Sequence, residues 1–208
     1  MRVVIYTFDH IEYTIQLAEA LSKLEDIMLM LPENKPGLSR NWFRKVLTDN
    51  VSIEPYYQPR LRYPTNLLSL FRTVKKIKDF NPDILHLQGE HPWFNLILPF
   101  LTKKYPLVAT VHDVVLHVGD VKSRKIPPFI YRLPVRYAEE IIVHGEKLKK
   151  EMMEKYNISV DNIHVIPRGV NSIYKRFLKR NIEEEEHLIL FFGRIYEYKG
   201  LRYLIEAE

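Results

Sequence analysis

Short apolar runs alternate along this chain with stretches in which apolar residues recur every three or four positions. Runs of the first kind predict strands, because a strand buried on both faces of a sheet has no place for charges. The spacing of three and four residues predicts amphipathic helices. We expect strands over 2–7, 27–31, 51–53, 83–87, 107–111, 140–144, 163–166 and 188–192. We expect helices over 11–24, 67–80, 93–101, 128–138, 146–156, 174–180 and from about 199 to the end.

This alternation predicts an α/β fold with a doubly wound, Rossmann-like parallel sheet, because each parallel crossover needs a right-handed helical return. Four consecutive glutamates at 183–186 indicate an exposed acidic linker. We therefore divide the chain into a first domain over 1–180, a linker over 181–187, and a final part over 188–208. That final part has one expected strand and one expected helix, too little for a core. We expect it to be the start of a second Rossmann-like domain.

The strand over 107–111 ends at His112 and Asp113, and we place the centre of the binding site there. In an open α/β sheet, ligands bind in the crevice beyond the carboxyl ends of the strands. His117, Gly119 and Asp120 follow in the same loop. The alternative is that His112 is an ordinary loop histidine, hydrogen-bonded to Asp113 or to a backbone carbonyl.

The loop after the strand over 83–87 carries two further candidate residues, Glu90 and His91. His86 lies inside the strand itself, and we expect it to be a packed, hydrogen-bonded core residue. The pairs formed by His86 with His91 and by His112 with His117 have the residue type of a metal site. Five-residue steps from a strand into a loop have no fixed geometry, however, so we expect no metal.

The amino-acid composition limits the classes of function that the protein can have. The 208 residues are 46% hydrophobic and 27% charged, as in an ordinary soluble globular protein. The absence of cysteine excludes disulfides, thiolate metal sites and a cysteine nucleophile. Together with few glutamines and many lysines and glutamates, it fits the composition of a thermophile. No apolar run approaches a membrane span and the chain starts on a strand, so we expect a cytoplasmic protein.

The net charge of +5 is unevenly distributed, and residues 40–78 are distinctly basic. Such a region fits peripheral contact with anionic lipid headgroups or a phosphorylated substrate, although a solvated helix face explains it equally well. No nucleic-acid motif is present, so we expect no nucleic-acid partner. The basic residues of this region are Arg40, Arg44, Lys45, Arg60, Arg62, Arg72, Lys75, Lys76 and Lys78.

Several stretches, in order, resemble the N-terminal half of a family-four glycosyltransferase of GT-B fold. No single stretch is diagnostic, but their order and spacing over residues 81–205 make the resemblance fairly specific, whereas residues 1–80 match in architecture alone. The stretches are Asn81 to His86, Thr110 to Asp113 with His117, Gly119 and Asp120, Ala138 to His144, Ile163 to Val170, and Phe192 to Arg194 with Lys199 and Gly200.

The resemblance implies an acceptor in the first Rossmann-like domain, a nucleotide-diphosphate sugar mainly in the second, and retaining hexosyl transfer to a glycan or lipid-linked acceptor. It implies that His112 is catalytic and contacts the donor sugar. Arg194 and Lys199 match the basic pair that holds the donor diphosphate, where fixed cations stabilise the leaving group without a metal cofactor. Asp113, His117, Asp120, Glu90 and His91 are then candidates to orient acceptor hydroxyls. The alternative is that Arg194 and Lys199 are ordinary surface cations with no role in binding.

Two departures from the family pattern keep other hypotheses open. The loop over 7–12 lacks the family's glycines, and most of a donor domain has no counterpart in these 208 residues. We therefore expect that the chain alone is inactive. One alternative is a non-catalytic half-enzyme that binds a glycan or protein partner, and a weaker one is an unrelated small-ligand domain. The strand over 188–192 is expected to pair with the main sheet or with a second copy of the chain, which would form a homodimer.

Overall fold

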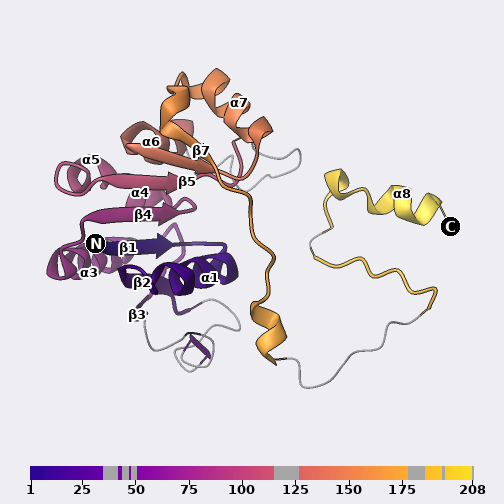
Figure 1. Ribbon diagram of the computed structural model, residues 1–208, viewed down its shortest axis with the longest axis horizontal. Coiled ribbons are helices and arrows are strands. Elements are labelled where there is room, and N and C mark those ends of the chain that lie inside the picture. Colours follow the sequence, from indigo (N-terminus) through magenta and orange to yellow (C-terminus); the bar gives the residue numbers. More distant parts are fainter. Residues whose placement is uncertain are drawn as a thin grey trace.

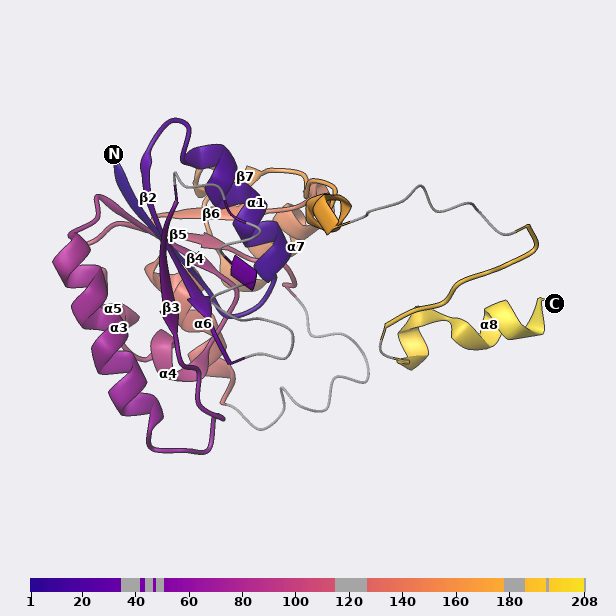
Figure 2. The same cartoon turned by 90° about the horizontal axis from the view of Figure 1, so that it is seen from below.

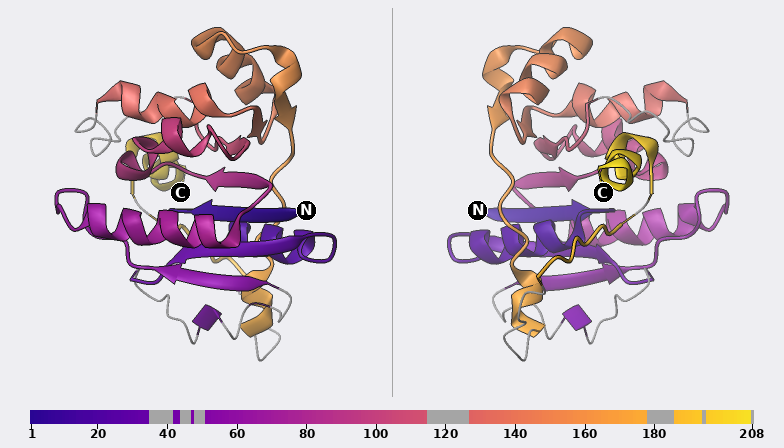
Figure 3. Two further views of the ribbon diagram at one scale, coloured as in Figure 1. Left: turned by 90° about the vertical axis from the view of Figure 1, so that its left-hand side faces the viewer. Right: turned by 90° about the vertical axis from the view of Figure 1, so that its right-hand side faces the viewer.

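The sheet is the frame of the molecule. The computed structural model describes residues 1–34, 42–43, 47, 51–114, 127–177, 186–193 and 195–207, and within them one all-parallel, seven-stranded sheet has the order β3-β2-β1-β4-β5-β6-β7 (Figures 1 and 3). The doubly wound fold predicted from the sequence is confirmed. The strands are β1 (Arg2–Thr7), β2 (Asp26–Pro32), β3 (Ser52–Tyr56), β4 (Ile84–Gln88), β5 (Leu107–Thr110), β6 (Glu140–Val143) and β7 (Ile163–Val165).

The strand order contains one reversal of direction. From β1 the chain moves outward to β2 and β3, and then returns to place β4 on the other side of β1, with Thr7 opposite Gln88. The later strands continue outward from β4. The carboxyl ends of β1 and β4 therefore diverge into different crossovers, which opens the crevice where such sheets bind ligands.

Helices cover both faces of the sheet, and α3 and α1 lie on opposite sides (Figure 2). The apolar stretch 93–101, expected as one helix, forms two short ones. Pro99 explains the break, because it has no N–H to donate to the carbonyl of Asn95 and its ring clashes with that carbonyl. The helices are α1 (Ile11–Leu21), α3 (Asn66–Phe80), α4 (Pro92–Asn95), α5 (Leu98–Leu101), α6 (Pro128–Tyr137), α7 (Glu146–Tyr156) and α8 (Leu201–Glu206), with 3-10 turns η2 (Val160–Asn162), η3 (Ile173–Phe177) and η4 (Glu197–Lys199).

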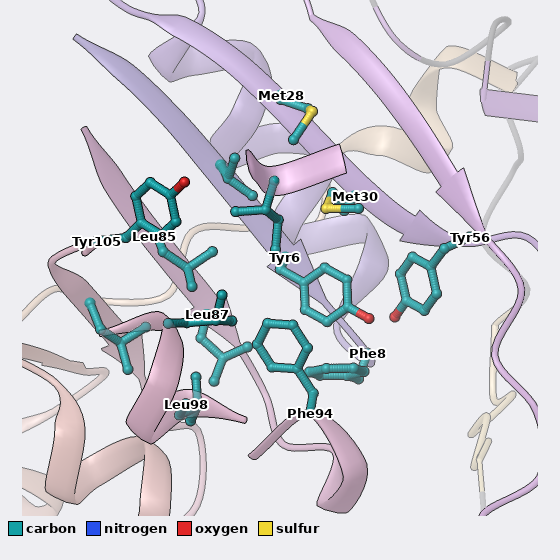
Figure 4. Close-up of a cluster of buried hydrophobic side chains, with 14 residues drawn as sticks. Tyr6, Phe8, Met28, Met30, Tyr56, Leu85, Leu87, Phe94, Leu98 and Tyr105 are labelled. Atoms are coloured by element: carbon teal, nitrogen blue, oxygen red, sulfur yellow. The ribbon is translucent and has the colours of Figure 1, made fainter. Parts of the chain in front are cut away.

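An aromatic cluster forms the core beneath α3 and α4. The ring of Tyr6 stacks between Tyr56, at 4.8 Å, and Phe94, at 4.3 Å, and Phe8 meets it edge-on at 4.5 Å (Figure 4). The hydroxyl of Tyr56 donates to the carbonyl of Thr7 at 2.7 Å. This packing holds the end of β1, and with it the loop that follows, in one position.

The other face is covered by α1, whose Ile15 and Ala18 are fully buried against β1 and β2. The chain returns to this helix near the end of the first domain. Residues 166–172 run from β7 past the carboxyl ends of the strands, and Ser172 donates to Gln16 from both its backbone N–H and its hydroxyl (Figure 1). We call residues 166–172 the return segment.

The strand predicted over 188–192 is not formed. Within the described residues 186–193 no strand is present, and Leu188, Ile189, Leu190 and Phe192 are all more than 60% exposed. A strand needs a paired neighbour, and β3 and β7 form the two edges of the described sheet without it. The expected pairing with the main sheet is therefore wrong, whereas the homodimer stays a prediction. The helix expected after Lys199 is present as α8, which stands away from the sheet (Figures 1 and 2).

Candidate functional site

Four strand ends deliver side chains to one edge of the sheet. His10 follows β1, His112 follows β5, His144 follows β6 and Arg168 follows β7. Because all strands are parallel, the residues that follow them emerge on the same side. We call His10, Tyr13, His112, His144 and Arg168 the histidine cluster.

His10 and His112 are in direct ring contact. Their ring centroids lie 3.6 Å apart with an interplanar angle of 24°. His10 is the residue before α1 and has left-handed backbone angles, with φ at 55°. Such angles are uncommon outside glycine. The loop over 7–12 contains no glycine and makes its turn at His10 instead. The turn places the His10 ring over His112.

Hydrogen bonds connect His112 to both neighbouring strands. Its Nδ1 lies 3.0 Å from Nε2 of His144, and its Nε2 lies 3.2 Å from Oε1 of Gln88 at the end of β4. His144 is held in turn by the carbonyl of Ile166, 2.9 Å from its Nδ1. Both nitrogens of His112 are thus engaged by protein groups.

Tyr13 and Arg168 complete the cluster on the side of α1. The Tyr13 ring stands edge-on to His112 at 5.8 Å and to His144 at 5.4 Å. The guanidinium carbon of Arg168 lies 5.6 Å from the centroid of the Tyr13 ring, within range of a cation–π contact. Arg168 thereby brings a fixed positive charge to the cluster.

Two imidazoles of the cluster, those of His10 and His112, resist protonation. Burial, followed by the nearby His10, His144 and Arg168, lowers the pKa of His112 to about 2. Burial and the charge of Arg168 also lower the pKa of His10, against the opposite effect of Asp9 and Asp113. At neutral pH both rings are therefore uncharged, and the cluster presents them as dipoles beside a guanidinium.

Glu90 lies in the loop after β4 and interacts electrostatically with Asp113 and Lys155. Burial raises the pKa of Glu90 to about 7, with Asp113 acting in the same direction and Lys155 opposing it. Lys155 reaches across from α7 and donates to the carbonyl of Val114 at 2.6 Å. Near neutral pH, Glu90 is therefore present both as the carboxylic acid and as the carboxylate. Such a shifted pKa is frequent at functional sites.

Comparison with known proteins identifies the family of the chain. The family model "Glycosyltransferase Family 4" matches residues 12–172. The chain belongs to glycosyltransferase family 4. No curated protein gave a significant match.

Solved structures share the fold with this family-four chain. The sucrose-phosphate synthase of Thermosynechococcus elongatus is 14% identical, with a TM-score of 0.66 over 100% of this chain and 59% of its own. The UDP-GlcNAc 2-epimerase of Methanocaldococcus jannaschii is 17% identical, with a TM-score of 0.60 over 85% and 47%. HepE of Anabaena, solved with UDP and glucose, is 14% identical, with a TM-score of 0.52 over 80% and 44%. The chain spans about half the length of these structures.

The site residues expected from the sequence fall into four groups. His112, Asp113 and Glu90 lie at the carboxyl edge of the sheet. His91 is 7% exposed and its ring packs on Phe8 at 4.8 Å, facing the aromatic core. Lys199 is in the segment that carries α8, where its Nζ lies beside Gly193. The fourth group, His117, Asp120 and Arg194, lies outside the described residues.

His86 is a core residue, as predicted. It is 6% exposed, its Nε2 lies 2.8 Å from the hydroxyl of Thr110 and 3.0 Å from Nε2 of Gln88, and burial lowers its pKa to about 4. In the described part of the chain, no group of three or more His, Asp or Glu side chains is arranged to hold a metal ion. His112 and His144 use their facing nitrogens for each other instead.

Four members of the histidine cluster are absent from our sequence-based list of site residues. His10, His144 and Arg168 each follow a strand, so the rule that placed His112 in the site also applied to them. Tyr13 lies in the first turn of α1 and does not directly follow a strand, so the rule did not apply to it. Which strand ends face one another depends on strand order, and the sequence pattern alone does not contain it.

Proposed function

We propose that this chain is the acceptor-side domain of a glycosyltransferase that moves a hexosyl group from a nucleotide-diphosphate sugar to a glycan or lipid-linked acceptor. The observation that carries the proposal is the convergence of His10, His112, His144 and Arg168 at the carboxyl edge of the sheet. Uncharged imidazoles offer hydrogen bonds to sugar hydroxyls, and a guanidinium suits phosphate. By resemblance the transfer retains the configuration of the sugar.

A nucleotide sugar is the donor that the relatives favour. HepE was solved with UDP and glucose, and the epimerase is named for UDP-GlcNAc. In this proposal Arg194 and Lys199 hold the diphosphate, and Arg168 adds a further cation at the edge of the first domain. Fixed cations stabilise the charge that develops on the leaving diphosphate, so the mechanism needs no metal cofactor.

The acceptor lies against Asp113 and Glu90 in this proposal. Carboxylates accept hydrogen bonds from hydroxyl groups, and Glu90 takes up a proton near neutral pH as well. His117 and Asp120 keep their proposed role as further acceptor-binding residues. His91 is assigned to packing instead, because its ring is buried against Phe8.

We further propose that the acceptor is reached at an anionic membrane surface. The first turns of α3 expose Leu67, Leu68 and Phe71, at 58%, 53% and 70%. The exposed Arg72 and Lys75 follow on the same helix. An apolar surface bordered by cations is typical of a helix that lies in the headgroup region. No described helix is long and apolar enough to cross a membrane.

Ligand-observed NMR tests the donor proposal. The purified chain is screened by saturation transfer against UDP-glucose, GDP-mannose and the free nucleoside diphosphates, beside the variants Arg194→Ala and Lys199→Ala. We expect binding of at least one nucleotide sugar and its weakening in both variants. Binding of glycans with no response to any nucleotide would contradict the donor proposal and favour a non-catalytic glycan-binding protein.

A further inference from the structure

The carbonyl of Ile166 determines where His144 carries a proton. A carbonyl oxygen accepts hydrogen bonds and cannot donate them, so Nδ1 of His144, 2.9 Å away, must be the donor. An uncharged imidazole has one N–H and one lone pair. Nε2 of neutral His144 therefore carries the lone pair, and it faces His112.

The same reasoning extends one residue further. Nδ1 of His112 lies 3.0 Å from Nε2 of His144, which carries the lone pair. A hydrogen bond between the two atoms therefore requires the proton on Nδ1 of His112. Nε2 of neutral His112 is then an acceptor. This is the opposite of the tautomer that a free histidine side chain favours in water, so the contact with His144 holds His112 in its less common form.

The tautomer of His112 determines which atom of the Gln88 amide can form a hydrogen bond with its Nε2. Oε1 of Gln88 lies 3.2 Å from Nε2 of His112, and Nε2 of Gln88 lies 3.0 Å from Thr110. Nε2 of His112 and Oε1 of Gln88 would then both be acceptors, which do not form a hydrogen bond. One solution is that the Gln88 amide is rotated by 180°. The other is that His144 is doubly protonated and donates to Nδ1 of His112, whose proton then lies on Nε2. The rotated amide needs no second proton on either histidine, and it donates to Nε2 of His112.

We propose that His144 is a positioning residue that holds His112 in the Nδ1–H tautomer, so that Nε2 of His112 meets a ligand hydroxyl only as an acceptor. Without a ligand the Gln88 amide, which is fully buried, occupies this lone pair, and a ligand hydroxyl has to displace it. The identity of the hydroxyl as one on a sugar rests on the proposed function, whereas the tautomer does not. A donor whose hydroxyl is replaced by a group without a proton loses this hydrogen bond.

Imidazole nitrogen NMR tests the tautomer directly. Long-range proton–nitrogen correlation spectra of the labelled chain at pH 7.5 show which ring nitrogen of each histidine is protonated. We expect the proton of His112 on Nδ1. In His144→Phe, which removes the acceptor but keeps a ring, we expect His112 to change to the Nε2–H tautomer. In His144→Gln, whose amide oxygen is able to accept the same hydrogen bond, we expect Nδ1–H to persist.

The control is His164→Gln, which alters an exposed histidine on β7 whose Nε2 bonds Glu140. It should leave the spectrum of His112 unchanged. An Nε2–H tautomer of His112 in the unaltered chain would overturn the proposal, and so would an unchanged tautomer in a folded His144→Phe variant. Neither result depends on a nucleotide sugar, so failure here is distinct from failure of the proposed function.

Discussion

Arg176 forms two hydrogen bonds with Glu19, from Nη1 to Oε1 at 2.8 Å and from Nη2 to Oε2 at 2.6 Å. The two residues lie 157 positions apart, one in η3 and the other on α1. The pair attaches η3, which directly follows the return segment, to the helix that carries Tyr13. Arg168 lies within that segment, so its position over Tyr13 depends on this attachment.

Loss of Arg176 should destabilise the domain. The Glu19 side chain is only 9% exposed, so Arg176→Ala leaves a largely buried carboxylate without its bidentate partner. We expect the free energy of unfolding to fall by about 2 kcal/mol. Urea unfolding of Arg176→Ala, Glu19→Gln and the double variant measures the coupling. Additive losses in the double variant would show that the pair contributes no coupling energy.

Mild acid should destabilise the fold through its neutral histidines. The pKa values of His86, about 4, and of His112, about 2, lie below the ordinary value near 6.5, so the unfolded chain binds protons first as the pH falls. Stability present above pH 6.5 is lost below it, by about 1.4 kcal/mol per pH unit for each group. Urea unfolding at pH 6.5 and 5.0 should show a smaller loss in His86→Gln than in the unaltered chain. An equal loss would refute the assignment.

Glu90 should have the opposite pH dependence. Its pKa of about 7 exceeds the ordinary value of 4.5, so the folded chain holds this proton more tightly and loses stability as the pH rises through that window. Glu90→Gln, which keeps the shape of the neutral acid, should raise the free energy of unfolding by about 1 kcal/mol at pH 8 and change little at pH 4.5. The exposed Glu139→Gln serves as the control, and a gain at pH 4.5 equal to that at pH 8 would speak against a buried proton.

The exposed turns of α3 should bind anionic vesicles. Phe71→Ser removes an apolar contact and should weaken co-sedimentation with phosphatidylglycerol vesicles about tenfold, and higher salt should weaken it further. Leu24→Ser changes an equally apolar, 80% exposed residue next to α1, which lies on the opposite face of the sheet from α3, and should have no effect. Vesicle binding that does not depend on salt or lipid charge, or an equal loss of binding in both variants, would contradict the proposed membrane contact.

The fold was predictable because its signals are local. The apolar runs that form β1, β2, β4 and β5 lie within a residue or two of their expected limits. The break at Pro99 was also predictable in principle, since a proline lacks the N–H that a helix needs. The segment over 188–192 was mistaken for a formed strand because an apolar run shows only the capacity to pair, and pairing depends on a neighbour.

The site was predictable only in part. His112 is marked by its place directly after a buried strand, and Glu90 by its loop. The contact of His10 with His112 depends on β1 and β5 flanking β4, an order that no local pattern reveals. His91 shows the converse, because a loop histidine at a carboxyl edge looks functional until its ring is seen to pack on Phe8.

Chemical-shift mapping with UDP-glucose tests the central claim most directly, namely that the histidine cluster binds the donor. Titration of the nitrogen-labelled chain should move the amide signals of Ile11, His112, His144 and Arg168 together, and Arg168→Gln should weaken binding about tenfold. Arg136→Gln, which alters an arginine 5.9 Å from a tyrosine ring on α6, should bind as the unaltered chain does. Shifts confined to residues away from the cluster, or equal weakening by both variants, would contradict the account.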